Sequence, residues 1–226
     1  MKKTIALCML VALSVISYSF KFVSGFEGSV TYSISFEGSG LPPEALAMFK
    51  GSEAISYIKG EKRRMDMNMP MQSTISISDA KTKTVSTYMD IMGMKYLIKM
   101  NENDIKKEEE KAPEMKIKYT DETKEVAGYK CKKAEVTLKT KEGKEETLNV
   151  YYTDEIPTTD VKSVYKGLKG FPLEYVIDQK GMKMKFTATK VNKETVPDSK
   201  FEISKDGYTE TTMEELQNAM MKMGGR

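Results

Sequence analysis

The stretch FEGSVTYSISF, residues 26–36, decides the fold class of this chain. Its apolar side chains recur at every second position from Val30 through Tyr32 to Phe36, and Ser or Thr residues stand between them. Successive side chains of a β-strand point to opposite faces of its sheet. A period of two therefore predicts an antiparallel strand with one buried face and one solvated face.

The same alternation recurs along most of the chain and predicts about eleven strands. Segments typical of hairpin turns separate the runs, at 79–82, around Gly93, at 141–144 and at 178–181. So many sequential strands predict a mainly β protein with a single curved antiparallel sheet, built as an open half-barrel. The later apolar runs are Ile75/Ile77, Val85/Met89, Met94/Tyr96/Ile98/Met100, Met115/Ile117/Tyr119, Ala134/Val136/Leu138, Leu148/Val150/Tyr152, Phe171/Leu173/Tyr175/Ile177 and Met182/Met184/Phe186/Ala188.

Two or three short helices are expected beside this sheet. Residues 43–50 follow a proline pair and stop before Gly51, so a short helix is predicted there. Residues 212–223 begin with a capping-box pattern, Thr212 with Glu215 or the pair one residue earlier, and carry an apolar stripe. A third short segment, residues 161–165, also has helical character.

Residues 101–114 form a charged insertion between two predicted strands. We predict the solvated tip of a long hairpin there, which could be helical for a turn or two. The spacing of its acidic side chains does not match a calcium-binding EF-hand loop.

The first residues are typical of a secretory signal peptide. Lys2 and Lys3 precede an apolar segment, residues 4–16, which is too short for a membrane span. Cleavage is expected after Ser19 or after Gly25, and we favour Gly25 because the strand pattern begins at the next residue. The expected organisation is therefore a signal peptide, residues 1–25, followed by one β domain, residues 26–226, exported to the periplasm. An uncleaved N-terminal anchor is the alternative.

Charge and composition argue against several classes of function. The chain has a net charge of +3, and the expected signal peptide contains three lysines and no acidic residue, so the mature chain would be neutral. No nucleic-acid partner is expected for a neutral chain, and no stable membrane span after cleavage. The chain has no histidine, which removes Ser-His-Asp catalysis and histidine-based zinc sites. We predict no catalytic residue, no metal site, no cofactor and a non-enzymatic function.

Cys8 lies inside the apolar segment, too early for a lipid-anchored cysteine, which leaves Cys131 as the lone thiol of the mature chain. Neighbouring lysines could lower the pKa of Cys131, and the alternation places it opposite the apolar face, partly exposed. A packed small hydrophobic side chain is the favoured interpretation.

Four methionines at alternate positions, Met65 to Met71, form the most distinctive feature of the chain. On one strand they would share a face, and their flexible thioethers suit a cavity that adapts to a lipid or an acyl chain. A Cu(I) site is a second interpretation, because soft thioethers select that ion. A closed core filled with methionine is the third. The expected cavity wall consists of Met65, Met67, Met69, Met89, Met94, Tyr96, Tyr175, Met184 and Phe186, with Met213, Leu216 and Met220 as a helical plug.

Arg63 and Arg64 stand beside this stripe. They could bind the carboxylate or phosphate head group of a ligand at the mouth of the cavity. A solvated strand end is the favoured interpretation of such a pair.

Several segments together resemble exported bacterial proteins of unknown function related to the LolA/LolB-type superfamily of periplasmic lipoprotein carriers. These segments are Phe26–Gly28, Lys59–Met65, Met92–Tyr96, Val126–Ala134, Val150–Thr153 and Gly170–Tyr175. Relatives with a GLPGLI motif share the Gly-Tyr-Lys-Cys element, but residues 167–173 read GLKGFPL here and depart from that motif. The resemblance implies a half-barrel whose concave face, plugged by helices, holds acyl chains, and it implies no catalytic residues. An envelope structural or interaction module without a small ligand is the remaining alternative.

Overall fold

The fold is described by a computed structural model, which covers residues 25–37, 42–139, 143, 145–158, 164–179 and 182–224. The expected signal peptide, apart from Gly25, and most of the third expected helix lie outside the described residues. The strands are β1 (Glu27–Glu37), β2 (Glu53–Lys59), β3 (Lys62–Met69), β4 (Gln72–Asp79), β5 (Thr84–Ile91), β6 (Met94–Met100), β7 (Glu114–Val126), β8 (Tyr129–Lys139), β9 (Glu145–Thr153), β10 (Phe171–Gln179), β11 (Met182–Lys193) and β12 (Thr209–Glu210). The helices are α1 (Pro43–Ala47), α2 (Glu102–Lys111), η1 (Asp198–Phe201) and α3 (Met213–Gly224).

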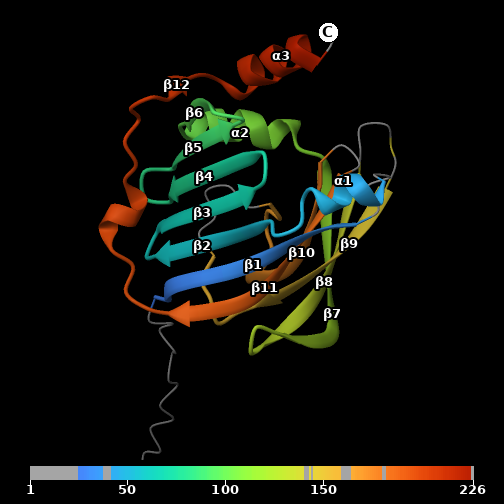
Figure 1. Ribbon diagram of the computed structural model, residues 1–226. Helices are drawn as coiled ribbons and strands as arrows, with labels where there is room; N and C mark the ends of the chain where they lie inside the picture. The colour runs from blue at the N-terminus through green and yellow to red at the C-terminus, as the bar shows by residue number, and fades with distance from the viewer. Residues whose placement is uncertain are drawn as a thin grey trace, which may run out of the picture.

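One sheet holds all twelve strands, in the order β12-β6-β5-β4-β3-β2-β1-β11-β10-β9-β8-β7 (Figure 1). Strands β1 to β6 form one antiparallel meander and β7 to β11 form another, and β1 pairs with β11 to join them. Only the short β12 runs parallel to its neighbour, β6. The predicted open, mainly antiparallel sheet is confirmed.

The sheet curls strongly, and helix α2 makes the curl visible. Strands β6 and β7 lie near opposite ends of the sheet, ten strand spacings apart, which is about 48 Å if the sheet were flat. The connection between them is the ten-residue helix α2, which is about 15 Å long. So short a connection requires the two ends of the sheet to approach one another.

The prediction of a hairpin tip at residues 101–114 was therefore wrong. The segment crosses between the two meanders, and most of it is helical. The Asn101 side chain accepts hydrogen bonds from the backbone N–H groups of Asn103 and Asp104, and the Asp104 carboxylate accepts one from the Asn101 N–H. This reciprocal capping box starts the helix, and its Ile105 side chain is buried. Strand pairing is decided by the whole sheet, so the local pattern gave no sign that β6 and β7 stand apart.

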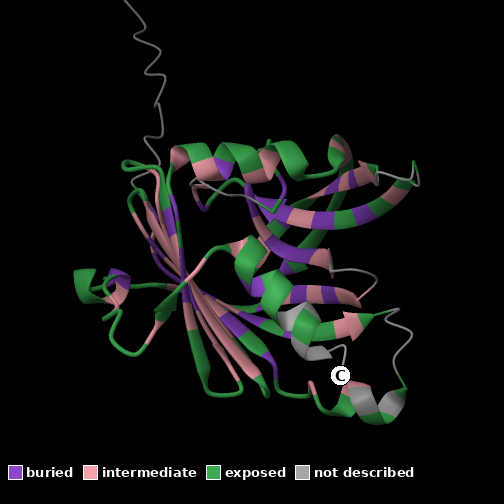
Figure 2. Cartoon of the chain, turned by 90° about the horizontal axis from the view of Figure 1, so that it is seen from above, coloured by how far each residue is buried: buried purple, intermediate pink, exposed green. Residues whose placement is uncertain are grey.

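Among the described residues, the core consists of two separate clusters of buried side chains. Figure 2 shows how buried and exposed residues are distributed along the chain. The main core lies between β1, β2 and the β8–β11 wall, and includes Ile156, Tyr165 and Leu168 from the β9–β10 connection. A second, smaller core joins β5 and β6 to α2 and α3 through Ile105 and Leu216. The core is therefore divided along the curve of the sheet.

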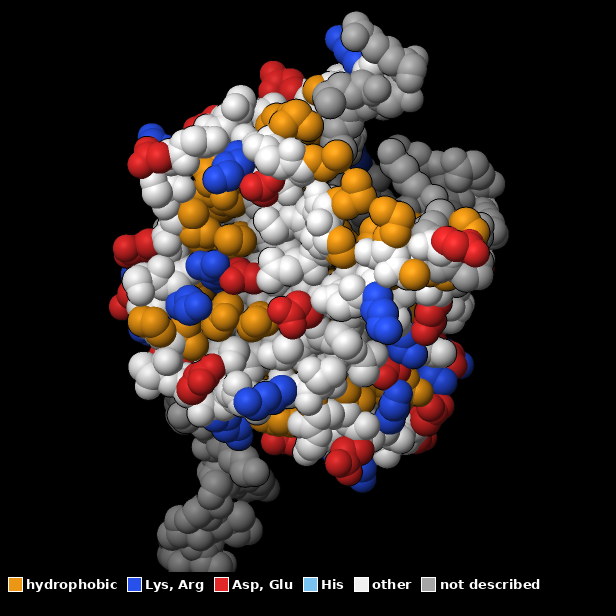
Figure 3. Space-filling view, viewed as in Figure 1, with side chains coloured by type: hydrophobic (Ala, Val, Ile, Leu, Met, Phe, Trp, Pro, Cys, Tyr) orange, Lys and Arg blue, Asp and Glu red, His pale blue; other side chains and the backbone are white. Residues whose placement is uncertain are grey.

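The segment after β11 runs as a strap along the left side of β2–β6 in Figure 1, and it contacts the convex face of these strands. We call residues 194–208 the strap. The Tyr88 hydroxyl donates a hydrogen bond to the Ile203 carbonyl, and the Tyr88 and Tyr208 rings meet edge to face at 5.2 Å. Lysines lie over strap and strand aromatics, for example Lys200 over Tyr57 at 4.5 Å. Figure 3 shows this side as hydrophobic side chains interspersed with lysines.

Two predicted helices, at residues 43–50 and 212–223, correspond in place to α1 and α3. Helix α1 is five residues long, and Phe49, just beyond it, packs on Phe36 of β1 with ring centroids 4.6 Å apart and the rings tilted by 35°. Helix α3 begins at the predicted capping box, in which Thr212 and Glu215 exchange backbone-to-side-chain hydrogen bonds of 3.2 and 3.0 Å. The hydrogen bonds that the Glu215 carboxylate accepts from the Thr212 N–H and the Thr211 hydroxyl hold the pKa of this carboxyl below its usual range.

Candidate functional site

The methionine stripe lies on the concave face of β3. Met65, Met67 and Met69 are partly buried and pack against the main core. Arg64 points the other way, where it binds Asp66 and the Lys200 carbonyl of the strap. The predicted stripe is confirmed for three of its four members. Met71 lies in the turn beyond Pro70, 49 % exposed, because β3 ends at Met69.

A contact across the curl fixes which face is concave. The Arg63 guanidinium of β3 lies 4.8 Å from the ring centroid of Phe171 in β10. Strands β3 and β10 are four spacings apart in the sheet, or about 19 Å along it. The contact is possible because both side chains point into the concavity, and Met65 shares the face of Arg63 by strand alternation.

Hydroxyl side chains continue this face beyond the methionines. Met65 pairs with Ser76 and Met67 pairs with Thr74 across β3 and β4, and Thr74 pairs in turn with Met89 of β5. All are partly buried. The apolar residues of β4, Ile75 and Ile77, occupy the opposite, convex face. We call the concave set the inner strip: Met65, Met67, Met69, Thr74, Ser76, Thr87 and Met89.

The structure does not bring the predicted cavity wall together in one place. Tyr175, Met184 and Phe186 are buried in the main core, where the Tyr175 and Phe186 rings stack at 4.8 Å. Met89 and Tyr96 pack instead against the second core. Two plug residues, Met213 and Leu216, pack in that second core as well, whereas Met94 is 38 % exposed and the Met220 side chain lies outside the described residues. The inner strip lies between these groups.

The open pockets among the described residues include one near α2 and one at the hairpin tips. One, of about 370 Å³, lies between α2 and the start of β7 and is lined by Ile105, Met115 and Val164, with Glu109 and Lys166 beside them. Nothing in the local pattern marks these residues as neighbours, because they meet only when the sheet curls. Lys166 and Glu109 form an ion pair of 2.7 Å there.

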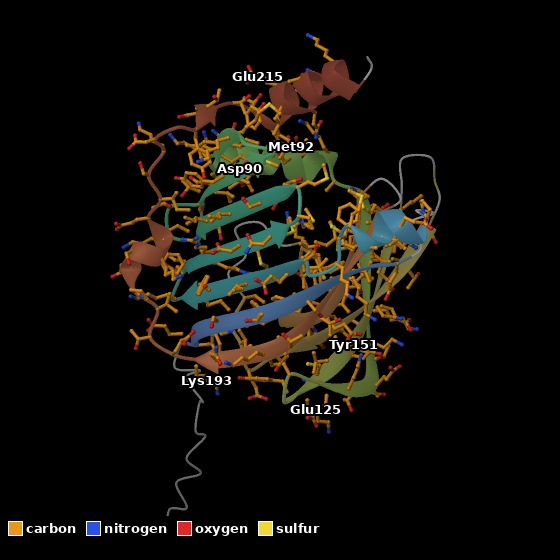
Figure 4. The ribbon with its side chains drawn as sticks, in the orientation of Figure 1. Asp90, Met92, Glu125, Tyr151, Lys193 and Glu215 are labelled. Carbon is orange, nitrogen blue, oxygen red and sulfur yellow. The ribbon has the colours of Figure 1, made fainter. Side chains whose placement is uncertain are left out.

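The second pocket, of about 470 Å³, lies at the tips of the β3–β4 and β5–β6 hairpins. It is lined by Met69, Met71 and Met92, with Asp90 nearby. Figure 4 labels Asp90 and Met92 at the β5–β6 turn, and Figure 3 shows hydrophobic side chains exposed in this region. Met92 has a positive φ of 53°, which turns the backbone tightly into Gly93.

Two buried phenols, Tyr32 and Tyr175, lie close enough to Arg63 for its charge to act on them. The Tyr32 hydroxyl donates a 2.8 Å hydrogen bond to the Pro172 carbonyl. Desolvation raises the pKa of Tyr175 to about 12 and raises that of Tyr32 well above its usual range, while the positive charge of Arg63 opposes both shifts. Both phenols therefore stay protonated at neutral pH.

Two further features bear on function. Among the residues that the structure describes, no three His, Cys, Asp or Glu side chains are placed to hold a metal ion. Over the same residues, no helix has the length and apolar character needed to cross a membrane.

Comparison with known proteins gives distant likenesses of fold. No family model and no curated protein matches the chain. The crystal structure of MucB is similar at 10 % identity and a TM-score of 0.35, over 79 % of this chain, and this chain spans 57 % of that one. A β-barrel-like protein of the domain of unknown function DUF1849 from Brucella abortus is similar at 10 % identity and a TM-score of 0.31, over 75 % of this chain and 98 % of that one. Likenesses this distant say nothing of activity.

Proposed function

We propose that this protein binds a hydrophobic ligand, a lipid or an acyl chain, along the inner strip, and that it does so as an exported periplasmic protein without catalysing a reaction. One observation carries the proposal: among the residues that the structure describes, no continuous core closes the concave face. The inner strip lies between two separate cores, and its methionines and hydroxyls are only partly buried.

The composition of the inner strip suits a surface that is covered intermittently. A closed core would place branched apolar residues opposite Met65 and Met67, but β4 presents Ser76 and Thr74 there. Hydroxyls tolerate water when the face is empty, and unbranched thioethers repack around ligands of different shape. An acyl chain would gain about 0.8 kcal/mol for each CH₂ group buried there, without a specific polar contact.

A neutral fluorescent dye, Nile red, tests this proposal. Met67→Asp places a charge at the centre of the inner strip, and we expect it to weaken dye binding by at least about ten-fold, since a carboxylate must be desolvated when the dye covers it. The matched control is Asn68→Asp, which adds the same carboxylate to the exposed, convex side of the same strand. The control should bind the dye like the unaltered protein.

Circular dichroism should accompany the titrations, so that loss of binding is separated from loss of fold. If Met67→Asp does not fold, Met67→Gln keeps the side-chain length and adds a polar amide without a charge. A folded variant that takes up the dye normally would place the binding site elsewhere. An unaltered protein that takes up no dye would favour an envelope module with a closed surface.

The hairpin tips favour Cu(I) binding as a second candidate function. Met69, Met71 and Met92 line one open pocket, and thioethers are the ligands that Cu(I) prefers. Titration with Cu(I) under reducing conditions should give tight binding that Met71→Leu and Met92→Leu abolish. Binding that survives in the double variant would remove this candidate.

A further inference from the structure

Arg63 faces the concavity with most of its hydrogen-bonding capacity unused. Its Nε–H donates to the Ser56 hydroxyl at 3.1 Å, and its guanidinium lies on the Phe171 ring. A guanidinium has five N–H donors. Within the described part of the chain, Arg63 makes no ion pair with a carboxylate, whereas its neighbour Arg64 is bound by Asp66, with Nη2 and Oδ2 2.9 Å apart.

Tyr175, which shares the main core with Phe171, carries a second unused donor in its hydroxyl. The side chain is 3 % exposed, and its hydroxyl makes no hydrogen bond to any described residue. A buried hydroxyl without a partner costs about 1–3 kcal/mol, so one that persists calls for an explanation. Tyr32, whose ring meets Tyr175 edge to face at 5.8 Å, already has a partner in the Pro172 carbonyl.

The electrostatic setting favours a negative ligand group. The positive charge of Arg63 acts on both phenols, and no carboxylate of the described residues neutralises it. The surroundings are otherwise apolar, with Phe171 on the guanidinium and Phe186 stacked on Tyr175. Low local polarity strengthens a charge-assisted hydrogen bond, so an anion brought here would be held more firmly than at the surface.

We propose that Arg63 and Tyr175 anchor the anionic head group of an amphiphile, a carboxylate or a phosphate, whose apolar chain lies along the inner strip. The inference rests on the function proposed above and adds the chemistry of the head group to it. Arg63 and Met65 share one face of β3, so the guanidinium and the thioethers form a continuous surface with a charged end and an apolar length. Such a surface matches a molecule with one anionic end.

Three ligands with the same twelve-carbon tail test the anchor: dodecanoate, dodecyl phosphate and dodecanol, each titrated calorimetrically into the protein. We expect at least one anion to bind at least ten-fold more tightly than dodecanol, since a charge-assisted hydrogen bond is worth about 1.5–3 kcal/mol. The more tightly bound anion identifies the head group.

Variants then assign the effect to the two residues. Arg63→Gln should weaken binding of the preferred anion at least ten-fold and change the affinity for dodecanol less than about two-fold. Tyr175→Phe should weaken binding of the anion by about two- to ten-fold, because a neutral hydrogen bond contributes that much to affinity. Arg64→Gln is the matched control, because it removes the same charge from the convex face. Should Arg63→Gln fail to fold, Arg63→Lys keeps the charge but loses the planar fork, and should bind the anion less tightly than the unaltered protein.

The outcomes separate the anchor from the proposed function. If dodecanol and both anions bind with equal affinity, or if folded Arg63→Gln binds the anion normally, the anchor is overturned and hydrophobic binding stands. If none of the three ligands binds, both proposals fail.

Discussion

Cys131 shows at the scale of one residue how packing changes the chemistry that a sequence suggests. Nearby lysines and strand alternation indicated a partly exposed thiol with a lowered pKa. The residue is fully buried, its thiol points to the Tyr129 carbonyl, and desolvation raises the pKa to about 11. The partial exposure was therefore predicted wrongly, and the packed small side chain is confirmed.

An irregularity in the β7–β8 hairpin lies near Cys131. The register of the hairpin is irregular between Tyr119 and Thr123, and beyond that point Lys124 reaches Glu174 of β10, with Nζ and Oε2 2.7 Å apart. Lys124 and Glu174 are two of the charges that act on the Cys131 thiol in this corner. Lys130 and Lys132 are exposed on either side of Cys131, and burial has a larger effect on the pKa of the thiol than they do.

We expect the native Cys131 thiol to resist alkylation by iodoacetamide. Its raised pKa keeps it protonated at pH 8, and the alkylation rate should rise only as the pH approaches about 11, rather than near 8.5 as for a free thiol. Mass spectrometry of the peptide that contains Cys131 measures the extent, with protein unfolded in urea as the control. Rapid labelling of the folded protein at pH 8 would contradict the buried position.

At the scale of elements, α2 is the connection on which the curl of the sheet depends. It joins the two meanders, and its Ile105 side chain belongs to the second core. Most of its surface is charged, so its local sequence resembles a solvated loop. The capping box at Asn101 and the burial of Ile105 are what hold it as a helix.

Asn101→Ala should lower the free energy of unfolding by about 1 kcal/mol, because two backbone N–H groups lose the acceptor that caps them. Urea denaturation measures the change. Asn103→Ala is the control: its exposed side chain forms no cap, and alanine favours the helix, so stability should not fall. An equal decrease in the free energy of unfolding of both variants would show that the Asn101 cap does not stabilise the helix.

At the scale of the whole molecule, one sheet creates two environments on its two faces. The strap covers the convex face of β2–β6 with aromatic and backbone contacts, so Ile75 and Tyr88 are covered there. On the concave face, the main core and the second core approach from the two ends of the curl and leave the inner strip between them. The binding function proposed here is therefore a property of the curvature rather than of any single strand.

Much of the fold could be predicted from the sequence, since local rules act through neighbouring residues. Alternation identified nearly all the strands, the turn segments separated them, and the Thr212–Glu215 pattern placed the start of α3. The face shared by Met65, Met67 and Met69 followed from the same period of two. These features depend on interactions within a few residues, which the order of residues determines directly.

Only the tertiary structure decided which of these faces meet. Three features depend on how far the sheet curls: whether a helix as short as α2 can join β6 to β7, whether Arg63 reaches Phe171, and how far Tyr175 lies from Met89. The curvature of the sheet accumulates from small twists and bulges over twelve strands, so no local sequence pattern predicts it. The sequence by itself determined the strands and their alternating faces, while the packing of distant strands determined the inner strip, the unneutralised arginine and the burial of Cys131.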